Sequence, residues 1–550
     1  MMKVKKFQSI FLLVLFSFTT YISYVFGTLY YITTMGPDYD YYKRYFSYFY
    51  GELQSTNLEQ GLLYFFSASH INTFRSEYIN PSNNLEFISN SIQTTNFIFY
   101  LIGILGIGFF LKHRKFKINT ILTVLTLLNF FPPLYEMRLL FKPEIIIFPT
   151  FVWTINFLNK YLQKQEVKYL IFTIFPIAIM LSSKANIAVM VVVFLTIFYL
   201  KKIYNVSPKN FYISFLLFVV TYLLISIENY YANGLLIHQH NLPEGFEGKA
   251  GLQYLFNLDI YSLITDPFRH SQKDSFVGVM LLDTFNDYFT ITWNDDSSIF
   301  ALNSIIIISS KLKPFISITL TLLMYFLFIL KLFSKDESRY YYAAPFVGII
   351  IQMLISQFTG YNPENGDIAK TYYYAFFLVI PFSLFFADSL KRNFKLFAPV
   401  ILIFCAGMTH IVGFPKQTDT SKDSFISFNN QISIFCEANN LLLIGNNSHC
   451  INLENYCELS YNPNNKTVII NSEYYQENLL VENWKLQFDK NETTKTLSTI
   501  EECRNYIKNG WEPSKTNITK NYPNINIMTL IIFLLSILSY STTTIKKDTN

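Results

Sequence analysis

Long apolar blocks separated by short basic segments constrain the fold of this chain more than any other feature. Of its 550 residues, 51% are hydrophobic and only 15% are charged. A hydrocarbon core of about 30 Å needs roughly 20 helical residues, and Phe7–Thr28 reaches that length. Backbone polar groups in lipid must be hydrogen-bonded within the protein, which only helices and closed barrels achieve. The sequence lacks the short alternating strands of a membrane barrel, so helices are expected. We therefore predict a mainly α polytopic membrane protein.

About twelve membrane-spanning helices are expected from the apolar blocks. The predicted spans cover residues 7–28, 96–111, 118–131, 145–159, 169–182, 186–200, 210–227, 314–333, 343–358, 371–389, 396–412 and 526–543. The first span is too long for a signal peptide, and no small-residue cleavage site follows it. Lys3, Lys5 and Lys6 then place the N-terminus inside.

The loops that this topology places inside are rich in Lys and Arg, as the positive-inside rule requires. They contain Lys112, Arg114, Lys115, Lys117, Lys160, Lys164, Lys168, Lys201, Lys202, Lys331, Lys335, Arg339, Lys391, Arg392, Lys546 and Lys547. Three long segments then lie outside: 29–95, 228–313 and 413–525. The inside loops also account for the net charge of +5, which therefore gives no reason to expect nucleic acid as a partner.

The short inside loops exclude a cytoplasmic nucleotide-binding domain. Neither a G-x-x-x-x-G-K-[ST] loop nor a strand-linked G-x-G-x-x-G occurs in the chain. Nucleotides are generally absent from the outer face, so an activated donor for chemistry there would arrive dissolved in the membrane. A lipid-linked phosphosugar fits this requirement.

Two acidic residues, Asp38 and Asp40, follow the first predicted span in Gly36–Asp40. Either carboxylate can accept the proton of an acceptor hydroxyl as that hydroxyl attacks a sugar carbon. A helix N-cap is the structural alternative, because Gly-Pro-Asp also suits turns and caps. We favour the catalytic interpretation, since the basic aromatic run Tyr41–Tyr45 follows directly.

Cations in two other outer segments are candidates for binding a phosphate. Arg138 and Lys142 lie between two short apolar spans, and Lys370 lies between Asn362–Asp367 and a run of tyrosines. Glu144, in the same stretch as Arg138 and Lys142, is a candidate for contacting the acceptor or supporting the site. Cations in a low-dielectric pocket would stabilise the charge on a departing lipid phosphate. Their alternative is snorkelling to the headgroup level.

The segment 228–313 offers weaker candidates. Asp287 lies in Leu281–Phe289, which reads as a short interfacial helix whose acids face either water or an acceptor sugar. His238 and His240 are separated by one residue, but no pattern such as H-E-x-x-H completes a metal site. We do not expect a metal at these histidines.

Together, the Asp38–Asp40 loop, the Arg138–Glu144 stretch and Lys370 before its tyrosines resemble the glycosyltransferase C superfamily of polytopic enzymes. This superfamily uses polyprenyl-phosphate sugars, and it includes the protein O-mannosyltransferase and aminoarabinose-transferase branches. The resemblance covers roughly residues 1–412. It implies a helical bundle with an outer-facing cavity, in which Asp38, Arg138 and Lys370 should converge.

The resemblance also implies an activity. A hexosyl or pentosyl group would be transferred with inversion from a polyprenyl-phosphate sugar to a glycan, lipid or protein acceptor. The general base would be Asp38 or, as second choice, Asp40, with Glu52 as a candidate supporting acid. Some relatives use a divalent metal, so a metal cofactor stays open. We expect the site on the extracytoplasmic face of a multi-pass protein in a bacterial inner membrane.

Residues 413–525 are predicted to form a separate small α/β domain outside the membrane, before a last helix and tail in 526–550. Leu441–Gly445 and Thr467–Ile470 suggest strands, and Ser498–Asn509 suggests a helix. Four cysteines lie here, and an oxidising compartment would join them as two disulfides with three possible connectivities. They are Cys436, Cys450, Cys457 and Cys503. Buried reduced thiols are the alternative.

Two other function classes remain open. A polysaccharide polymerase or ligase would also work outside, but it usually relies on Arg and His in large outer loops. A transporter or flippase for lipid-linked sugars would place charges or broken helices near the bilayer midplane, ideally with internal repeats. We find no clear repeat, and the ionisable residues lie at the outer helix ends. The glycosyltransferase interpretation therefore leads.

Overall fold

The computed structural model describes most of the predicted helical core and short pieces of the C-terminal segment. The described residues are 2–30, 45–46, 48–49, 62–78, 85–129, 131, 134, 137–138, 141–203, 208–233, 276–284, 304–335, 338–358, 371–391, 441–444, 449–452, 461–462, 467–471, 484–486, 494–499, 502 and 511–513.

Helices form at every predicted span from 7–28 to 371–389, whereas the spans 396–412 and 526–543 lie outside the described residues. The larger helices are α1 (Met2–Tyr30), α3 (Leu62–Tyr78), α4 (Leu85–His113), α5 (Ile118–Leu128), α7 (Ile147–Lys164), α8 (Val167–Ser183), α9 (Ala185–Ile203), α10 (Pro208–Asn233), α16 (Ser304–Leu332), α18 (Ala344–Phe358) and α19 (Thr371–Lys391). Shorter elements are η2 (Pro143–Ile146), α13 (Phe276–Asp283) and α17 (Arg339–Tyr342).

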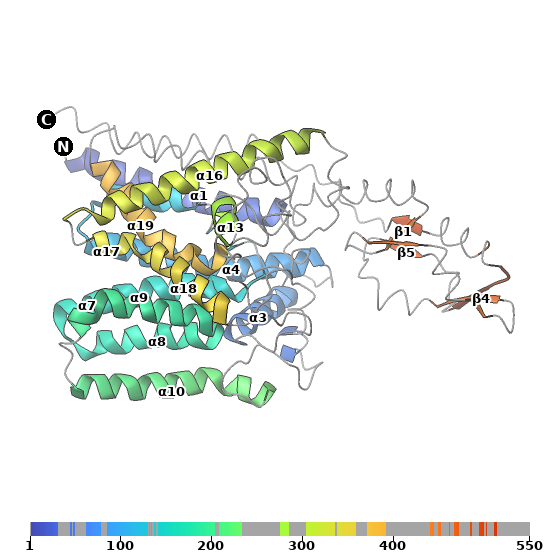
Figure 1. The fold of residues 1–550 in the computed structure, drawn as a ribbon, viewed down its shortest axis with the longest axis horizontal. Helices are drawn as coiled ribbons and strands as arrows, with labels where there is room; N and C mark the ends of the chain where they lie inside the picture. Colours follow the sequence, from blue (N-terminus) through green and yellow to red (C-terminus); the bar gives the residue numbers. More distant parts are fainter. Residues whose placement is uncertain are drawn as a thin grey trace.

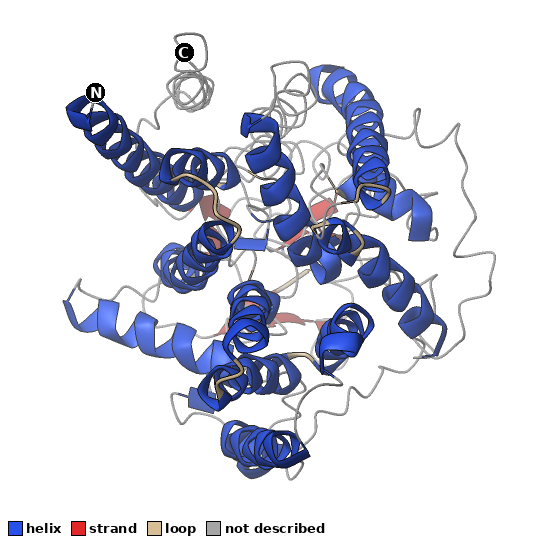
Figure 2. Ribbon diagram, turned by 90° about the vertical axis from the view of Figure 1, so that its left-hand side faces the viewer, coloured by secondary structure: helices blue, strands red, loops and turns tan. Residues whose placement is uncertain are grey.

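Among the described helices, three are long and apolar enough to cross a membrane: Phe7–Val25, Ile88–His113 and Pro143–Lys164. Shorter apolar helices accompany them, for example Val167–Ser183 and Phe376–Leu390. Many of the helices run side by side (Figure 1), and Figure 2 shows several of them nearly end-on. This arrangement is consistent with a multi-pass membrane protein.

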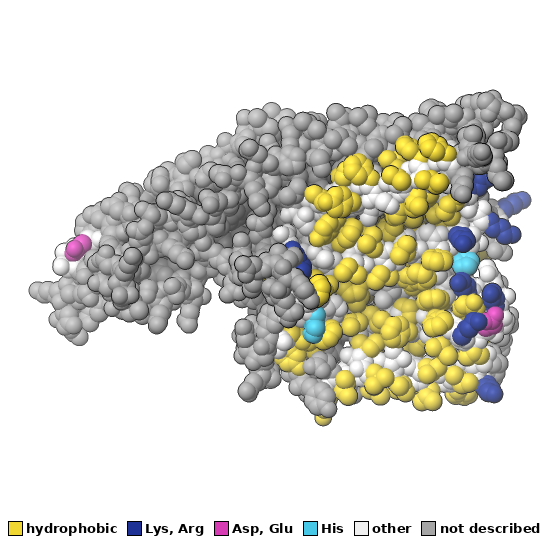
Figure 3. Space-filling view, turned by 180° about the vertical axis from the view of Figure 1, so that it is seen from behind, with side chains coloured by type: hydrophobic (Ala, Val, Ile, Leu, Met, Phe, Trp, Pro, Cys, Tyr) yellow, Lys and Arg dark blue, Asp and Glu magenta, His cyan; other side chains and the backbone are white. Residues whose placement is uncertain are grey.

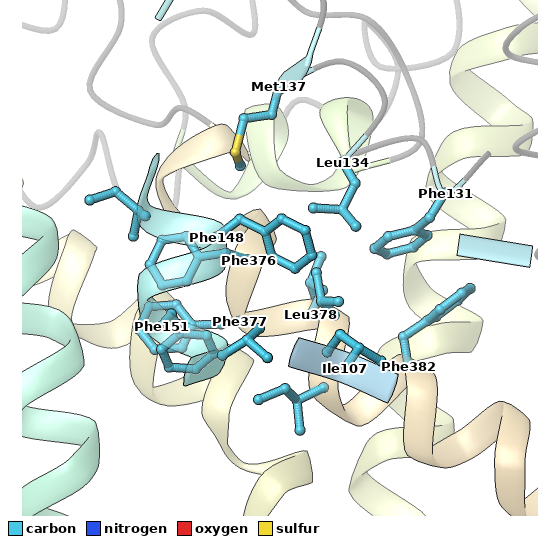
Figure 4. Close-up of a cluster of buried hydrophobic side chains, with 14 of the residues drawn as sticks. Ile107, Phe131, Leu134, Met137, Phe148, Phe151, Phe376, Phe377, Leu378 and Phe382 are labelled. Atoms are coloured by element: carbon cyan, nitrogen blue, oxygen red, sulfur yellow. The ribbon is translucent and has the colours of Figure 1, made fainter. Parts of the chain in front are cut away.

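The core of the bundle is built from aromatic and aliphatic side chains of α4, α7 and α19. Phe148, Phe151 and Phe377 are fully buried, and they lie together with Phe376 in the cluster of Figure 4. Helices α4 and α7 approach closely at Gly103, where a Cβ atom would meet the Phe148 ring at 2.3 Å. A small residue lets two helices pack at this distance, as in many membrane proteins.

The predicted outer segment 29–95 contains more helix than the sequence pattern indicated. Helix α3 lies within it, and α4 begins at Leu85 rather than near residue 96. The first half of α4 is polar, yet its side chains are buried among neighbouring helices; they include Ser89, Ser91, Gln93, Thr95 and Asn96. A hydropathy pattern identifies lipid-facing helices and therefore misses a helix whose polar residues bind each other.

Basic side chains gather at one end of the bundle. The last turn of α4 and the residues that follow it, together with the end of α7 and the start of α8, carry exposed lysines: Lys112, Lys115, Lys117, Lys164 and Lys168. Figure 3 shows this basic band along one edge of the molecule, with a hydrophobic face beside it. All of these lysines lie in loops that the sequence places inside.

The described pieces of residues 441–513 are short antiparallel strands. Strands β1 (Leu441–Ile444) and β2 (His449–Asn452) pair, as do β5 (Trp484–Leu486) and β7 (Trp511–Pro513). Strand β4 (Thr467–Asn471) lies between β3 (Tyr461–Asn462) and β6 (Thr494–Leu497). The strands lie beyond one end of the bundle (Figure 1), and the basic band lies at the other end (Figure 3).

The strands expected at Leu441–Gly445 and Thr467–Ile470 are thus present. Most of the helix expected at Ser498–Asn509 lies outside the described residues. An α/β domain spanning residues 413–525 therefore stays a prediction.

Candidate functional site

The charged stretch between α5 and α7 is buried at the end of the bundle opposite the basic band. Arg138, Lys142 and Glu144 are only 2%, 2% and 1% exposed. Glu144 lies in η2, where Pro143 begins a short 3₁₀ turn before α7. Snorkelling is therefore wrong for these residues, because a snorkelling side chain carries its charge to water.

Arg138 links α1 to α4. Its Nη2 atom donates to the backbone oxygen of Ser23 at 2.9 Å and to the Ser23 Oγ at 2.7 Å. The guanidinium carbon lies 5.0 Å from the ring centre of Tyr100, and the Arg138 backbone oxygen accepts a 2.8 Å hydrogen bond from Asn96. A cation on an aromatic face with charge-assisted hydrogen bonds is held firmly in one position.

Asn129, at the C-terminal end of α5, extends this network. Its side-chain nitrogen donates to Thr19 and Thr20 at 3.2 and 2.9 Å, and its side-chain oxygen accepts from Tyr100 at 2.8 Å. The Ser23 hydroxyl donates to the Asn129 backbone oxygen at 3.1 Å. We call Thr19, Thr20, Ser23, Tyr64, Asn96, Tyr100, Asn129 and Arg138 the polar layer.

Tyr64 connects the polar layer to the charged residues. Its hydroxyl donates to the Asn96 side chain at 2.7 Å, and it also lies close enough to Glu144 for an electrostatic interaction. Because Tyr64 lies on α3 and Asn96 on α4, this contact holds the outer helix α3 against the polar half of α4.

The buried carboxylate of Glu144 forms an ion pair with Lys184, which lies between α8 and α9. The distance from Lys184 Nζ to Glu144 Oε1 is 2.7 Å, and the Lys184 side chain is 14% exposed. Lys142 interacts electrostatically with the same carboxylate. Two cations therefore surround one buried anion, an arrangement that favours the binding of a further negative charge.

Lys184 was not among the site residues predicted from the sequence. The signal was available, because Ser182, Ser183 and Lys184 are a short polar interruption between two apolar spans on the predicted outer side. A lysine at that position is unexpected under the positive-inside rule.

An aromatic clasp joins residues that follow the acidic loop to the segment that leads into Lys142. We define it as Tyr45, Phe46, Phe65 and Phe141. Tyr45 stacks on Phe65 with ring centres 3.9 Å apart, and Phe46 stacks on Phe141 at 5.4 Å. Phe65 meets Phe141 edge-on at 5.6 Å. All four rings are buried, so Tyr45 and Phe46 are fixed beside the charged stretch.

Several predicted site residues lie outside the described residues, so their convergence with Arg138 stays a prediction. They are Asp38, Asp40, Glu52, Asp287 and Lys370, and also Cys436, Cys457 and Cys503. Cys450 lies in β2 opposite Leu443. Within the part of the chain that the structure describes, no group of His, Cys, Asp and Glu side chains could hold a metal ion.

Comparison with known proteins gives one result for this region. No curated protein was found to match the chain. A family model does match, and its segment includes Arg138, Lys142 and the Glu144–Lys184 pair. Residues 85–228 match the dolichyl-phosphate-mannose-protein mannosyltransferase family, which confirms over this segment the resemblance to the glycosyltransferase C type of polyprenyl-phosphate-sugar-dependent membrane enzymes.

Proposed function

We propose that the protein transfers a sugar from a polyprenyl-phosphate donor to an acceptor on the extracytoplasmic face of a bacterial inner membrane. The family match over residues 85–228 carries this proposal, since the buried cations Arg138 and Lys142 lie within the matched segment. A buried site with an excess of cations suits the phosphate of a lipid-linked donor.

The distribution of charge in the bundle supports the extracytoplasmic side. Basic residues mark the end with Lys115 and Lys164, which the positive-inside rule assigns to the cytoplasm. Helix α5 leads away from this basic end, and α7 leads back to it at Lys164, so Arg138 and Glu144 between these helices lie at the opposite end. The donor phosphate would therefore bind at the outer headgroup level.

In this mechanism Asp38, or Asp40 as second choice, removes the proton from an acceptor hydroxyl. The acceptor oxygen attacks the anomeric carbon from the face opposite the phosphate and forms the new glycosidic bond. The bond from that carbon to the phosphate oxygen breaks, and its electron pair leaves with the polyprenyl phosphate. The configuration at the anomeric carbon is inverted, and the proton stays on the aspartate.

Lys142, Lys370 and Arg138 are the proposed contacts for the departing phosphate. Arg138 also has a second task, because its contacts with Ser23 hold the end of α1 in place. Asp38 follows the end of α1 by eight residues in the sequence, in the predicted acidic loop. The aromatic clasp ties the chain after that loop to Phe141, next to Lys142. These two attachments would keep the base near the phosphate-binding cations.

Other roles in the proposal rest on the sequence alone. Glu52 and Asp287 are candidates for supporting the base or for contacting the acceptor.

The test is sugar transfer by purified protein from a panel of polyprenyl-phosphate sugars. We expect Asp38→Asn to abolish transfer while thermal unfolding is unchanged, because general-base assistance contributes roughly 10²–10⁴-fold. Asp388→Asn is the matched control, since Asp388 lies on α19 near the basic end and pairs with Lys331 at 3.7 Å. Full activity of Asp38→Asn would remove Asp38 as the base.

A further inference from the structure

Lys184 lies at the end of the bundle opposite the basic band, where the positive-inside rule gives no reason for a lysine. Helix α8 runs from Val167, beside Lys168 of the basic band, to Ser183. Its 17 residues rise about 25 Å, so Lys184 lies that far from the band. Its backbone is extended (φ −156°, ψ 97°), and the chain then reverses into α9. Lysines at this end oppose the positive-inside preference and need another explanation.

Glu144 fixes the position of the Lys184 ammonium. The carboxylate is fully enclosed, and its Oε1 atom lies 2.7 Å from Nζ. Its other oxygen, Oε2, has no hydrogen-bond partner within the described part of the chain. Burying a carboxylate is costly unless a cation compensates it, so the pair forms a stable unit. Lys184 is the more exposed member of that unit.

We propose that Lys184 contacts the phosphate of the polyprenyl-phosphate donor, and that Glu144 is a positioning residue that holds the ammonium in place. The inference rests on the proposed function and extends its site by a residue that the sequence did not single out. Lys142 supports it, because a second cation near the same carboxylate leaves this cluster with an excess of positive charge. An ammonium is a compact point charge that suits a phosphate oxygen.

The competing explanation is a purely structural ion pair that ties η2 to the start of α9. Single variants cannot separate the two, because removing either partner leaves a buried charge and destabilises the fold. A double variant can separate them. Replacing a buried ion pair by neutral side chains of similar size is often neutral for stability. Glu144→Gln/Lys184→Met should therefore unfold at nearly the same temperature as the wild type.

The experiment measures binding of polyprenyl phosphate, without sugar, to the purified full-length protein, together with thermal unfolding. We expect Lys184→Met and the double variant to bind the lipid at least about tenfold more weakly, because each loses one charge-assisted hydrogen bond to the phosphate. Glu144→Gln, which keeps the lysine, should lose less. Lys184→Arg should restore part of the affinity.

A matched pair controls for the loss of any Lys–carboxylate interaction. Lys331→Met/Asp388→Asn removes a partly buried pair near the basic end and should leave lipid binding unchanged. Wild-type affinity in the Glu144→Gln/Lys184→Met variant would overturn the inference and leave the proposed function standing. Absence of binding by the wild-type protein would overturn both.

Discussion

The two ends of the helical bundle use charge in opposite ways. At one end, Lys115, Lys117 and Lys164 are exposed to solvent. At the other, Arg138, Lys142 and Glu144 are buried and contact helices from distant parts of the sequence. Exposed lysines cost little and set the orientation of the protein in the membrane. Buried charges are expensive, and in a membrane protein they usually mark a functional site.

The same residue types occur at both ends, which allows matched comparisons. Arg138 lies over Tyr100, and Arg114 lies over Tyr341 at 5.5 Å. Asn129 accepts a hydrogen bond from Tyr100, and Asn159 likewise accepts one from Tyr341 at 3.3 Å and also donates one to it at 3.0 Å. Equivalent substitutions at the two ends should therefore differ in their effect on activity or on stability, even where they remove similar contacts.

Phe141→Ala should have the largest effect. Phe141 and Phe110 are both 1% exposed, and Phe110 packs edge-on against Tyr341 at 5.1 Å near the basic end. Either change to Ala removes a buried ring and should cost about 3–5 kcal/mol of stability. Only Phe141→Ala opens the aromatic clasp, so we expect sugar transfer to fall only there, chiefly in kcat. Equal loss of transfer per folded molecule in both variants would contradict a special role for the clasp.

Arg138→Ala ranks next. The change removes two charge-assisted hydrogen bonds to Ser23 and a cation–π contact, for which we expect about 3 kcal/mol of destabilisation. Arg114→Ala, at the half-buried end of α4, should cost less than about 1 kcal/mol. Thermal unfolding in detergent measures both. Similar shifts in unfolding temperature for the two variants would mean that Arg138 in the polar layer stabilises the protein no more than Arg114 does near the surface.

Asn129→Ala should have the smallest effect of the three. Its side chain makes hydrogen bonds with Thr19, Thr20 and Tyr100, and the loss should cost about 1–3 kcal/mol. Asn159→Ala, the control, should cost about 1 kcal/mol, because the Asn159 side chain is only half-buried. A larger shift for Asn159 would place the tighter network at the basic end instead.

The helical core could be predicted from sequence because lipid-facing helices consist of long apolar runs, which a hydropathy pattern detects. Spans such as 118–131 and 169–182 coincide with α5 and α8 within a few residues. The polar half of α4 could not be found in this way. Its residues, including Asn96, are buried through contacts with Tyr64 and Arg138, which are distant in sequence.

The candidate site was only partly predictable for the same reason. Arg138, Lys142 and Glu144 stood out as a dense charged stretch, and burial confirms that they are not ordinary snorkelling residues. Their partner Ser23 gave no comparable signal, because a single polar residue at a helix end has many ordinary explanations. Lys184 gave a weaker signal than the charged stretch, a single cation in the short polar interruption 182–184. The positions of Asp38 and Lys370 relative to this cluster remain predictions.

The central claim is that the end with the buried charges faces the extracytoplasmic side. Labelling by a membrane-impermeant thiol reagent in intact cells tests it. The labelling of the protein without the added cysteine is subtracted as background. We predict that Tyr39→Cys is labelled in intact cells, and that Lys117→Cys in the basic band is labelled only after permeabilisation. The reverse pattern would contradict the orientation and with it the proposed site.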